Sequence, residues 1–310
     1  MNTVLQPARL DPDEFKALSE RRNFPGVARA IVHFSAIGLM SYLIWHTKTR
    51  YGSLYAAPFL VVQGYLIAFL FTAVHECAHK TAFESRFLSL LVGNLAAFLV
   101  VLPYEYYSAF HWDHHRYTQD PEKDPELVTA MKTDTPLRTA FAYTGFYQLI
   151  NRSRLYFRHA VTGRVKAPWV REKQRGMIVR EARAYVLGYL ALLALSIALD
   201  TTILVWTWVV PLFIGQLFLR PYLYTEHTGC AHSRNAVENT RTTYTNPLVR
   251  WFAWNMPYHV EHHAHPSVPF HALPRLNRMI APHTVHSAKG YFAAVGETWR
   301  ALHKAKTIRK

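Results

Sequence analysis

Cysteine is scarce in this sequence, with only Cys77 and Cys230 among 310 residues. Two thiols are too few for a disulfide-stabilised scaffold, a cysteine-ligated iron–sulfur cluster or a zinc site with four cysteine ligands. The chain also has no G-x-G-x-x-G dinucleotide fingerprint, no internal repeat and no flexible Gly/Ser linker. We therefore expect one domain over residues 1–310, without a redox group of these kinds.

Long apolar runs are present although the mean hydropathy is only −0.04. Residues 1–26 lack the apolar core and cleavage site of a secretory signal peptide, so we expect a cytoplasmic N-terminal segment. A membrane span needs roughly 20 apolar residues. The runs at 27–46, 54–74, 184–199 and 202–224 therefore predict an all-α integral membrane protein with about four transmembrane helices in two hairpins. The run at 87–102 is too short to cross twice, and we interpret it as re-entrant or interfacial.

Positive charge is in excess, with 35 Lys and Arg against 20 Asp and Glu, and it is unevenly placed. Residues 105–183 hold 14 Lys or Arg and residues 225–310 hold 11, whereas the connections 47–53 and 200–202 hold two and none. The positive-inside rule then puts both termini and both long polar segments in the cytoplasm, where we expect a helical cap. Because topology accounts for the charge, we expect no nucleic-acid partner.

Eight of the 18 histidines lie in three short clusters, two of which share the spacing H-x-x-H-H. The clusters are His75 and His79; His111, His114 and His115; and His259, His262 and His263. Residues three and four apart share one face of a helix, so each cluster can direct its imidazoles to one point. Eight ligands exceed the roughly six that one ion accepts, which favours two metal ions.

Imidazole binds zinc, copper, iron and nickel, so ligand type alone leaves the metal open. The segment 75–79 also matches H-E-x-x-H, the motif of zinc metalloproteases, but an intramembrane zinc protease would leave six clustered histidines unexplained. A di-iron carboxylate site needs two E-x-x-H pairs, and we find only Glu76 with His79. A metal transporter would carry ionisable residues along several spans, where only His33 and Asp200 qualify. We interpret His33 as satisfied by a helix–helix hydrogen bond.

Four segments together resemble the membrane-bound fatty acid desaturase and hydroxylase superfamily. They are HECAHK (75–80), HWDHHRYTQDPEKDPE (111–126), TEHTG (225–229) and NMPYHVEHHAHPSVPFHALPRL (255–276). HExxHK, EHTG and HHAHP also resemble the membrane alkane monooxygenases. The spacing of the second cluster is closer to that of desaturases, and the surroundings of the third resemble bacterial desaturases of the rhizobitoxine type.

The resemblance implies an O₂-dependent centre of two iron ions at the cytoplasmic mouth of a multi-pass protein, with a bacterial inner membrane as its expected location. Its implied reaction is the introduction of a double bond into a fatty-acyl or other lipid-like substrate. The alternative is hydroxylation of an alkyl, fatty-acyl or carotenoid-like substrate. Matched residue by residue, the iron ligands would be His75, His79, His111, His114, His115, His227, His259, His262 and His263.

His227 is the ninth of these ligands because it lies at the cytoplasmic end of the last apolar run. His232 competes with it, but five residues place His232 about 140° further around a helix. We therefore expect His227 to join the site and leave His232 out.

Residues beside the clusters are interpreted from their positions. We expect the acidic neighbours Glu76, Asp113 and Glu261 to orient the ligand imidazoles. We interpret the acidic run Asp120, Glu122, Asp124 and Glu126 as solvated charge. Tyr104, Tyr106 and Tyr107 could line a substrate mouth, but we favour a role as interfacial anchors.

The resemblance also implies a separate electron donor, because O₂ activation needs electrons and this chain shows no group to carry them. The donor would be a ferredoxin, a rubredoxin or a cytochrome b5-like protein with its reductase. Such donors are usually acidic, so we expect the basic cytoplasmic face to steer them.

Overall fold

The computed structural model describes residues 10–304, which are mostly helical. The helices are α1 (Pro12–Leu18), α2 (Asn23–Tyr51), α3 (Ser53–Ala78), α4 (Arg86–Leu99), α5 (Tyr104–Tyr117), α6 (Pro125–Val128), α7 (Pro136–Thr144), α8 (Phe146–Thr162), α9 (Glu172–Ala198), η1 (Val205–Val209), α10 (Val210–His227), α11 (Ala236–Asn239), α12 (Pro247–Phe252), α13 (His259–Ala264), α14 (Leu273–Ile280), η2 (Ala281–His283) and α15 (Tyr291–Lys304). Two strands, β1 (Arg241–Tyr244) and β2 (His286–Lys289), pair in parallel. The all-α prediction is therefore wrong for this small sheet, whose four-residue strands are too short to show a clear alternation of apolar and polar residues.

Three helical units among residues 10–304 are long and apolar enough to cross a membrane: Pro12–Tyr51, α3 and α9. They contain the predicted spans 27–46 and 54–74, and the span 184–199 except for its last residue. Gly52, with φ of 100°, allows the sharp turn between α2 and α3. Inside this hairpin His33 Nε2 lies 2.8 Å from the carbonyl oxygen of Leu66, which confirms the expected helix–helix hydrogen bond.

The predicted span 202–224 is divided between η1, a short π-helix, and α10. α10 is not among the units apolar enough to span, considering the described residues alone. The helix contains Gln216 and Arg220 in its middle and ends in Thr225, Glu226 and His227, and these polar residues lower its mean hydropathy. The C-terminal residues bring α10 to the histidine clusters.

The segment predicted to be re-entrant is α4, which is followed by α5 at a bend of 99°. The two helices together have the composition of one broken span or of a re-entrant loop, so residues 10–304 contain three candidate spans, or four if this pair counts as one. The bend returns the chain towards the end of α3. Consequently the second histidine cluster, on α5, lies on the same side as the first.

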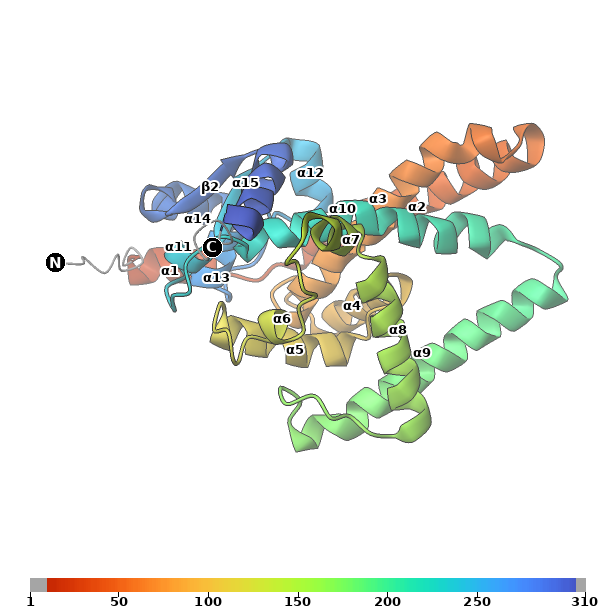
Figure 1. The fold of residues 1–310 in the computed structure, drawn as a ribbon, viewed down its shortest axis with the longest axis horizontal. Helices are drawn as coiled ribbons and strands as arrows, with labels where there is room; N and C mark the ends of the chain where they lie inside the picture. Colours follow the sequence, from red (N-terminus) through yellow and green to blue (C-terminus); the bar gives the residue numbers. More distant parts are fainter. Residues whose placement is uncertain (1–9, 305–310) are drawn as a thin grey trace.

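The molecule has two ends with different character (Figure 1). The turns of the hairpins α2–α3 and α9–α10 lie at one end, on the right of the view. The C-terminal elements, from α11 to α15, gather at the other end with α1. The third histidine cluster is on α13 in this C-terminal group, so the fold brings it to the ends of α3 and α10.

Two glycines allow α3 and α10 to pack closely. A Cβ atom on Gly215 would lie 2.3 Å from the carbonyl oxygen of Gly64, and a Cβ on Gly64 would lie 2.9 Å from that of Pro211. His75 follows Gly64 by 11 residues, and His227 follows Gly215 by 12. At a rise of 1.5 Å per residue these offsets differ by only about 1.5 Å. The contact therefore sets a register in which both histidines reach the same depth.

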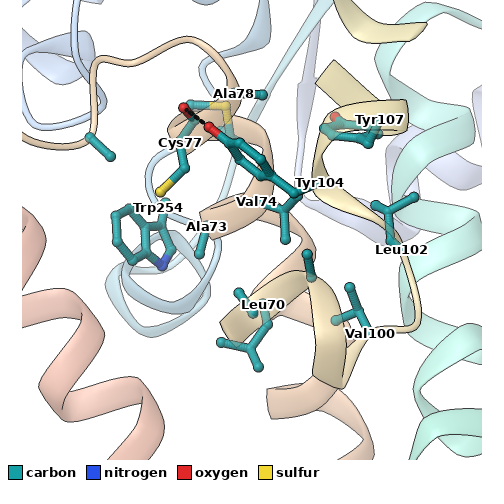
Figure 2. Close-up of a cluster of buried hydrophobic side chains, with 14 of the residues drawn as sticks. Leu70, Ala73, Val74, Cys77, Ala78, Val100, Leu102, Tyr104, Tyr107 and Trp254 are labelled. Carbon is teal, nitrogen blue, oxygen red and sulfur yellow. Dashed lines mark hydrogen bonds between the residues drawn. The ribbon is translucent and has the colours of Figure 1, made fainter. Parts of the chain in front are cut away.

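The turn between α4 and α5 is attached to the end of α3 (Figure 2). The Tyr104 hydroxyl donates a 2.7 Å hydrogen bond to the carbonyl oxygen of Cys77, two residues before His79. Tyr104, Tyr106 and Tyr107 are at most 8% exposed. The prediction that they are interfacial anchors is therefore wrong: they pack between helices in the core cluster.

The orientation in the membrane stays a prediction from the Lys/Arg asymmetry, and the structure supplies positions for testing it. Thr49 and Thr202 are exposed near the hairpin turns, Glu122 is exposed near the histidines, and both native cysteines are buried. We expect an impermeant thiol reagent added outside cells to label Thr49→Cys and Thr202→Cys but not Glu122→Cys. Permeabilised cells should label all three. External labelling of Glu122→Cys would contradict the cytoplasmic location of the site.

Candidate metal centre

Four helices supply the nine histidines expected from the sequence. The first cluster ends α3, the second lies along α5, the third forms most of α13, and His227 is the last residue of α10. All nine side chains converge inside the protein. Seven of them are at most 6% exposed, and the other two, His115 and His263, are half-buried.

Five imidazoles form one group, with one ligand atom from each lying within 4.8 Å of all the others. They are His75, His79, His111, His115 and His262. Nε2 of His111 lies 2.7 Å from Nε2 of His79 and 3.1 Å from that of His115. Nε2 of His262 lies 3.1 Å from that of His115. All three clusters contribute to this group.

A second group contains His114, His227 and His263, again within 4.8 Å of one another. His259 lies beside it, with its Nε2 3.2 Å from Nε2 of His227. The two groups touch through His115 and His263, whose stacked rings have centroids 4.1 Å apart. The structure thus divides the nine histidines into two adjacent sets.

The nitrogen spacing fits the ligand shell of metal ions. Two nitrogens bound at about 2.1 Å and at right angles are about 3 Å apart, close to the 2.7–3.2 Å observed between paired Nε2 atoms. Several ring nitrogens are buried without a hydrogen-bond partner, including both nitrogens of His75 and Nε2 of His263. A buried polar atom without a partner is costly, and a bound ion would satisfy these nitrogens.

The protonation of the third cluster also suits metal binding. Burial lowers the pKa of His259, His262 and His263 well below its usual range, and the neighbouring histidines lower it further. These rings are therefore neutral near pH 7, which is the form that binds a metal.

In the second group, each histidine has a hydrogen-bond partner at Nδ1. Nε2 of each ring is therefore left to point towards the other histidines. His114 Nδ1 lies 2.9 Å from Asp124 Oδ1, and His227 Nδ1 lies 3.1 Å from the carbonyl oxygen of Asn239. His263 Nδ1 lies 3.3 Å from the Thr118 hydroxyl. Such partners determine which ring nitrogen is free for a metal.

Asp124 corrects the interpretation of the acidic run as solvated. Its side chain is 1% exposed and also accepts hydrogen bonds from the backbone amides of Gln119 and Glu126. Burial alone would raise the pKa of Asp124, but these bonds and the one from His114 lower it overall, so the carboxylate stays charged. A local signal existed: Asp124 precedes Pro125 and caps the short helix α6.

The three acids expected to orient ligands bond elsewhere, so that prediction is wrong in detail. Glu76 accepts from the Thr81 hydroxyl at 2.7 Å and from the amide of Phe270 at 3.0 Å. Glu261 accepts from Thr242 at 2.6 Å and Asn277 at 2.5 Å, and Asp113 pairs with Arg116. Asp113 and Glu261 are one or two positions from each histidine of their cluster, and such side chains do not face each other on a helix. Glu76 lies three residues before His79, but its carboxylate is bonded to Thr81 and Phe270. Glu76 and Glu261 instead fasten α3 and α13 to the surrounding segments.

The structure separates His227 from His232. His227 is 6% exposed and belongs to the second group. His232 is exposed, and its Nδ1 lies 2.9 Å from the carbonyl oxygen of Gln119.

A cavity of about 630 Å³ reaches the second histidine group. His227, Asp124 and Gln119 are part of its wall, and apolar side chains including Phe71, Leu102, Tyr107, Phe110, Leu155 and Leu223 also line it. Sequence reasoning missed this cavity because α5, α8 and α10, which line it, are far apart in the chain.

The chain is similar to proteins of one family. The family model named Fatty acid desaturase matches residues 52–294. Dihydrorhizobitoxine desaturase of Bradyrhizobium elkanii is 28% identical over 261 residues, which cover 80% of this chain and 72% of the relative. A fatty acid desaturase of Bacillus subtilis is 24% identical over 238 residues, 69% of this chain and 64% of the relative.

A relative from an animal has a name that covers two reactions. The sphingolipid delta(4)-desaturase/C4-monooxygenase DES2 of Rattus norvegicus is 29% identical over 222 residues, 68% of this chain and 60% of the relative. The matched region thus spans somewhat under two thirds of the Bacillus and rat relatives.

The contrast between His227 and His232 generates a prediction about metal content. We expect His227→Ala to lower the bound metal of the purified protein by about half, because it removes a ligand from the smaller group. His232→Ala should leave the metal content unchanged and serves as the matched control. Metal is counted by mass spectrometry of the purified protein. If His232→Ala lost metal and His227→Ala did not, the ligand would be His232, and our choice of His227 would be wrong.

Proposed function

This chain belongs to the fatty acid desaturase family and is an oxidoreductase, and from that premise we propose that it uses O₂ to introduce a double bond into a lipid-like substrate at a pair of iron ions. The observation that carries the proposal is the convergence of nine imidazoles in two adjacent groups at the end of a largely apolar cavity. A set of imidazole nitrogens without cysteine suits iron, although imidazole also binds other metals.

The two groups divide the proposed ligands. His75, His79, His111, His115 and His262 would hold one ion, and His114, His227 and His263, with His259 beside them, would hold the other. Bound iron supplies the activation of O₂ that no side chain of the protein can provide.

The remaining residues position the substrate and the ligands. The apolar walls of the cavity exclude water and hold an alkyl chain against the second group. Asp124 keeps the Nδ1 proton on His114, so that Nε2 faces inwards. Helix α10 supplies both His227 and part of the cavity wall, and it therefore ties the substrate position to the metal position.

Hydroxylation is a second candidate because one relative is named as both a desaturase and a C4-monooxygenase. The two reactions share the first removal of hydrogen. They differ in the second step, which removes another hydrogen from the neighbouring carbon in desaturation and adds oxygen in hydroxylation. We favour desaturation because the relatives' names share it.

The product distinguishes these outcomes. We expect a host that expresses the chain to accumulate a compound two hydrogens lighter than its precursor. The His262→Ala variant removes a ligand nitrogen from the group of five histidines. It should reach the membrane but form at least tenfold less product. Mass spectrometry of cell extracts measures both. A product heavier by one oxygen would support hydroxylation instead, and an unchanged extract from cells that contain metal-loaded protein would contradict both reactions.

We further propose that the electron donor is a separate acidic protein that docks at a cleft beside the group of five histidines. The cleft has a volume of about 610 Å³ and is lined by five cationic and three acidic side chains: Arg21, Lys80, Arg86, Arg116 and Arg171, and Glu84, Glu105 and Asp113. Trp112 lies at this cleft and is 43% exposed. Its ring centroid is 5.0 Å from that of His79, so the indole links the protein surface to the proposed ligands.

Electrostatic docking predicts a dependence on salt. We expect the rate of reduction by an acidic ferredoxin to fall as ionic strength rises, because salt screens surface charges. Arg116→Gln, at the cleft, should slow reduction several-fold, whereas Arg154→Gln on exposed α8 should not. Stopped-flow absorbance of the donor gives the rates. Equal rates for the two variants, or no effect of salt, would contradict docking at this cleft.

A further inference from the structure

The cavity that reaches the histidines contains two arginines that form no ion pair within the described residues. Arg152 on α8 and Arg220 on α10 both line it. Within residues 10–304 no ion pair joins either side chain to a carboxylate, and the guanidinium group of Arg220 forms no hydrogen bond. The guanidinium carbon of Arg220 lies 5.9 Å from the centroid of the Tyr224 ring. Arg152 donates one hydrogen bond of 2.8 Å to the carbonyl oxygen of Val100.

Other hydrogen-bonding groups around this part of the cavity also lack partners. The Tyr156 side chain is 4% exposed and lines the cavity, yet its hydroxyl has no hydrogen-bond partner. Nε of Arg152 is also buried at the cavity wall without a partner. Unpaired buried donors are rare in folded proteins because each is costly. These unpaired donors around one cavity therefore indicate that a polar ligand binds there and accepts their hydrogen bonds.

The charge of these donors indicates the sign of the ligand. Two guanidinium groups that repel one another are stabilised by an anion between them. Guanidinium groups match carboxylate and phosphate oxygens in geometry and charge. The acids in the cavity wall are Asp124, which is bonded to His114, and Glu126, whose charge acts on Arg220. Glu126 forms no ion pair with either arginine among the described residues, so the two guanidinium groups keep free donors.

The position of Arg220 relates this pocket to the metal centre. Arg220, Leu223, Tyr224 and His227 all line the cavity from α10, at the spacing that keeps residues on one helix face. Seven residues separate Arg220 from His227, which corresponds to about 10 Å along the helix. An anion at Arg220 would thus share one cavity with the second histidine group, about two helical turns away along α10.

We propose that Arg152, Arg220 and Tyr156 form an anion-binding subsite, and that the substrate is an amphipathic molecule whose carboxylate or phosphate group is bound there. The inference rests on the proposed function only in that the alkyl chain of the bound molecule is oxidised. It names the substrate class: a chain with an anionic end, in contrast to a neutral hydrocarbon or carotenoid. The bond that is oxidised would lie at a fixed distance from the anionic group.

Equilibrium binding of radiolabelled dodecanoate to the purified protein in a neutral maltoside detergent tests the subsite. We expect dodecanoate to bind at least tenfold more tightly than its methyl ester, which keeps the chain but has no charge. Competition by dodecyl phosphate distinguishes the sources of the anion: stronger competition than by dodecanoate would indicate a phosphate-bearing lipid, and weaker competition a free acid. Either order supports the subsite.

Substitutions locate the binding. Arg220→Gln should weaken dodecanoate binding by about tenfold or more, as expected for loss of a charge-assisted hydrogen bond, and should leave the affinity for the ester unchanged. Tyr156→Phe, which removes only the hydroxyl, provides a second variant if Arg220→Gln fails to fold. Arg154→Gln, on the exposed side of α8, is the control.

The metal content of the same samples separates this proposal from the proposed function. Normal metal with weakened dodecanoate binding in Arg220→Gln supports the subsite, whatever the reaction is. If dodecanoate and its methyl ester bind equally, or if neither Arg220→Gln nor Tyr156→Phe weakens dodecanoate binding, the subsite is excluded even where desaturation is observed.

Discussion

The burial of nine imidazoles in one small volume is the constraint on which the rest of this structure depends. Ring nitrogens of neighbouring histidines lie 2.7–3.2 Å apart, and several have no hydrogen-bond partner. Without a shared ligand this arrangement costs free energy, because each buried polar atom has given up its water. The helices must therefore hold the rings together against that cost, and much of the fold can be understood as the means of doing so.

The supporting contacts act on helix ends, where the histidines are. The glycine contact between α3 and α10 brings His75 and His227 to one depth. Tyr104 attaches the start of α5 to the end of α3, and Glu76 attaches the end of α3 to the segment after α13. None of these residues needs to touch a metal for its loss to disturb the site, because each sets the position of a helix that carries ligands.

The two histidine groups face different parts of the molecule. The group of five histidines adjoins Trp112 and the basic cleft, where the proposed donor would dock. The second group adjoins the apolar cavity, where the proposed substrate would bind. This separation would allow electrons and substrate to reach the centre by different routes, while His115 and His263 keep the groups in contact.

Local patterns in the sequence were sufficient to identify the histidines, because metal-ligand spacing on a helix is a property of three to five consecutive residues. The spans 27–46, 54–74 and 184–199 were found for the same reason, since a long apolar run is visible in one segment. His227 needed the resemblance as well, because a single histidine carries no spacing signal. Only the tertiary structure decided which residues lie behind the imidazoles. The sequence favoured Glu76, Asp113 and Glu261, whereas Asp124, Thr118 and the carbonyl oxygen of Asn239 occupy those positions. The cavity with Arg152, Tyr156 and Arg220 was equally invisible, because its walls are assembled from segments that meet only when the chain packs.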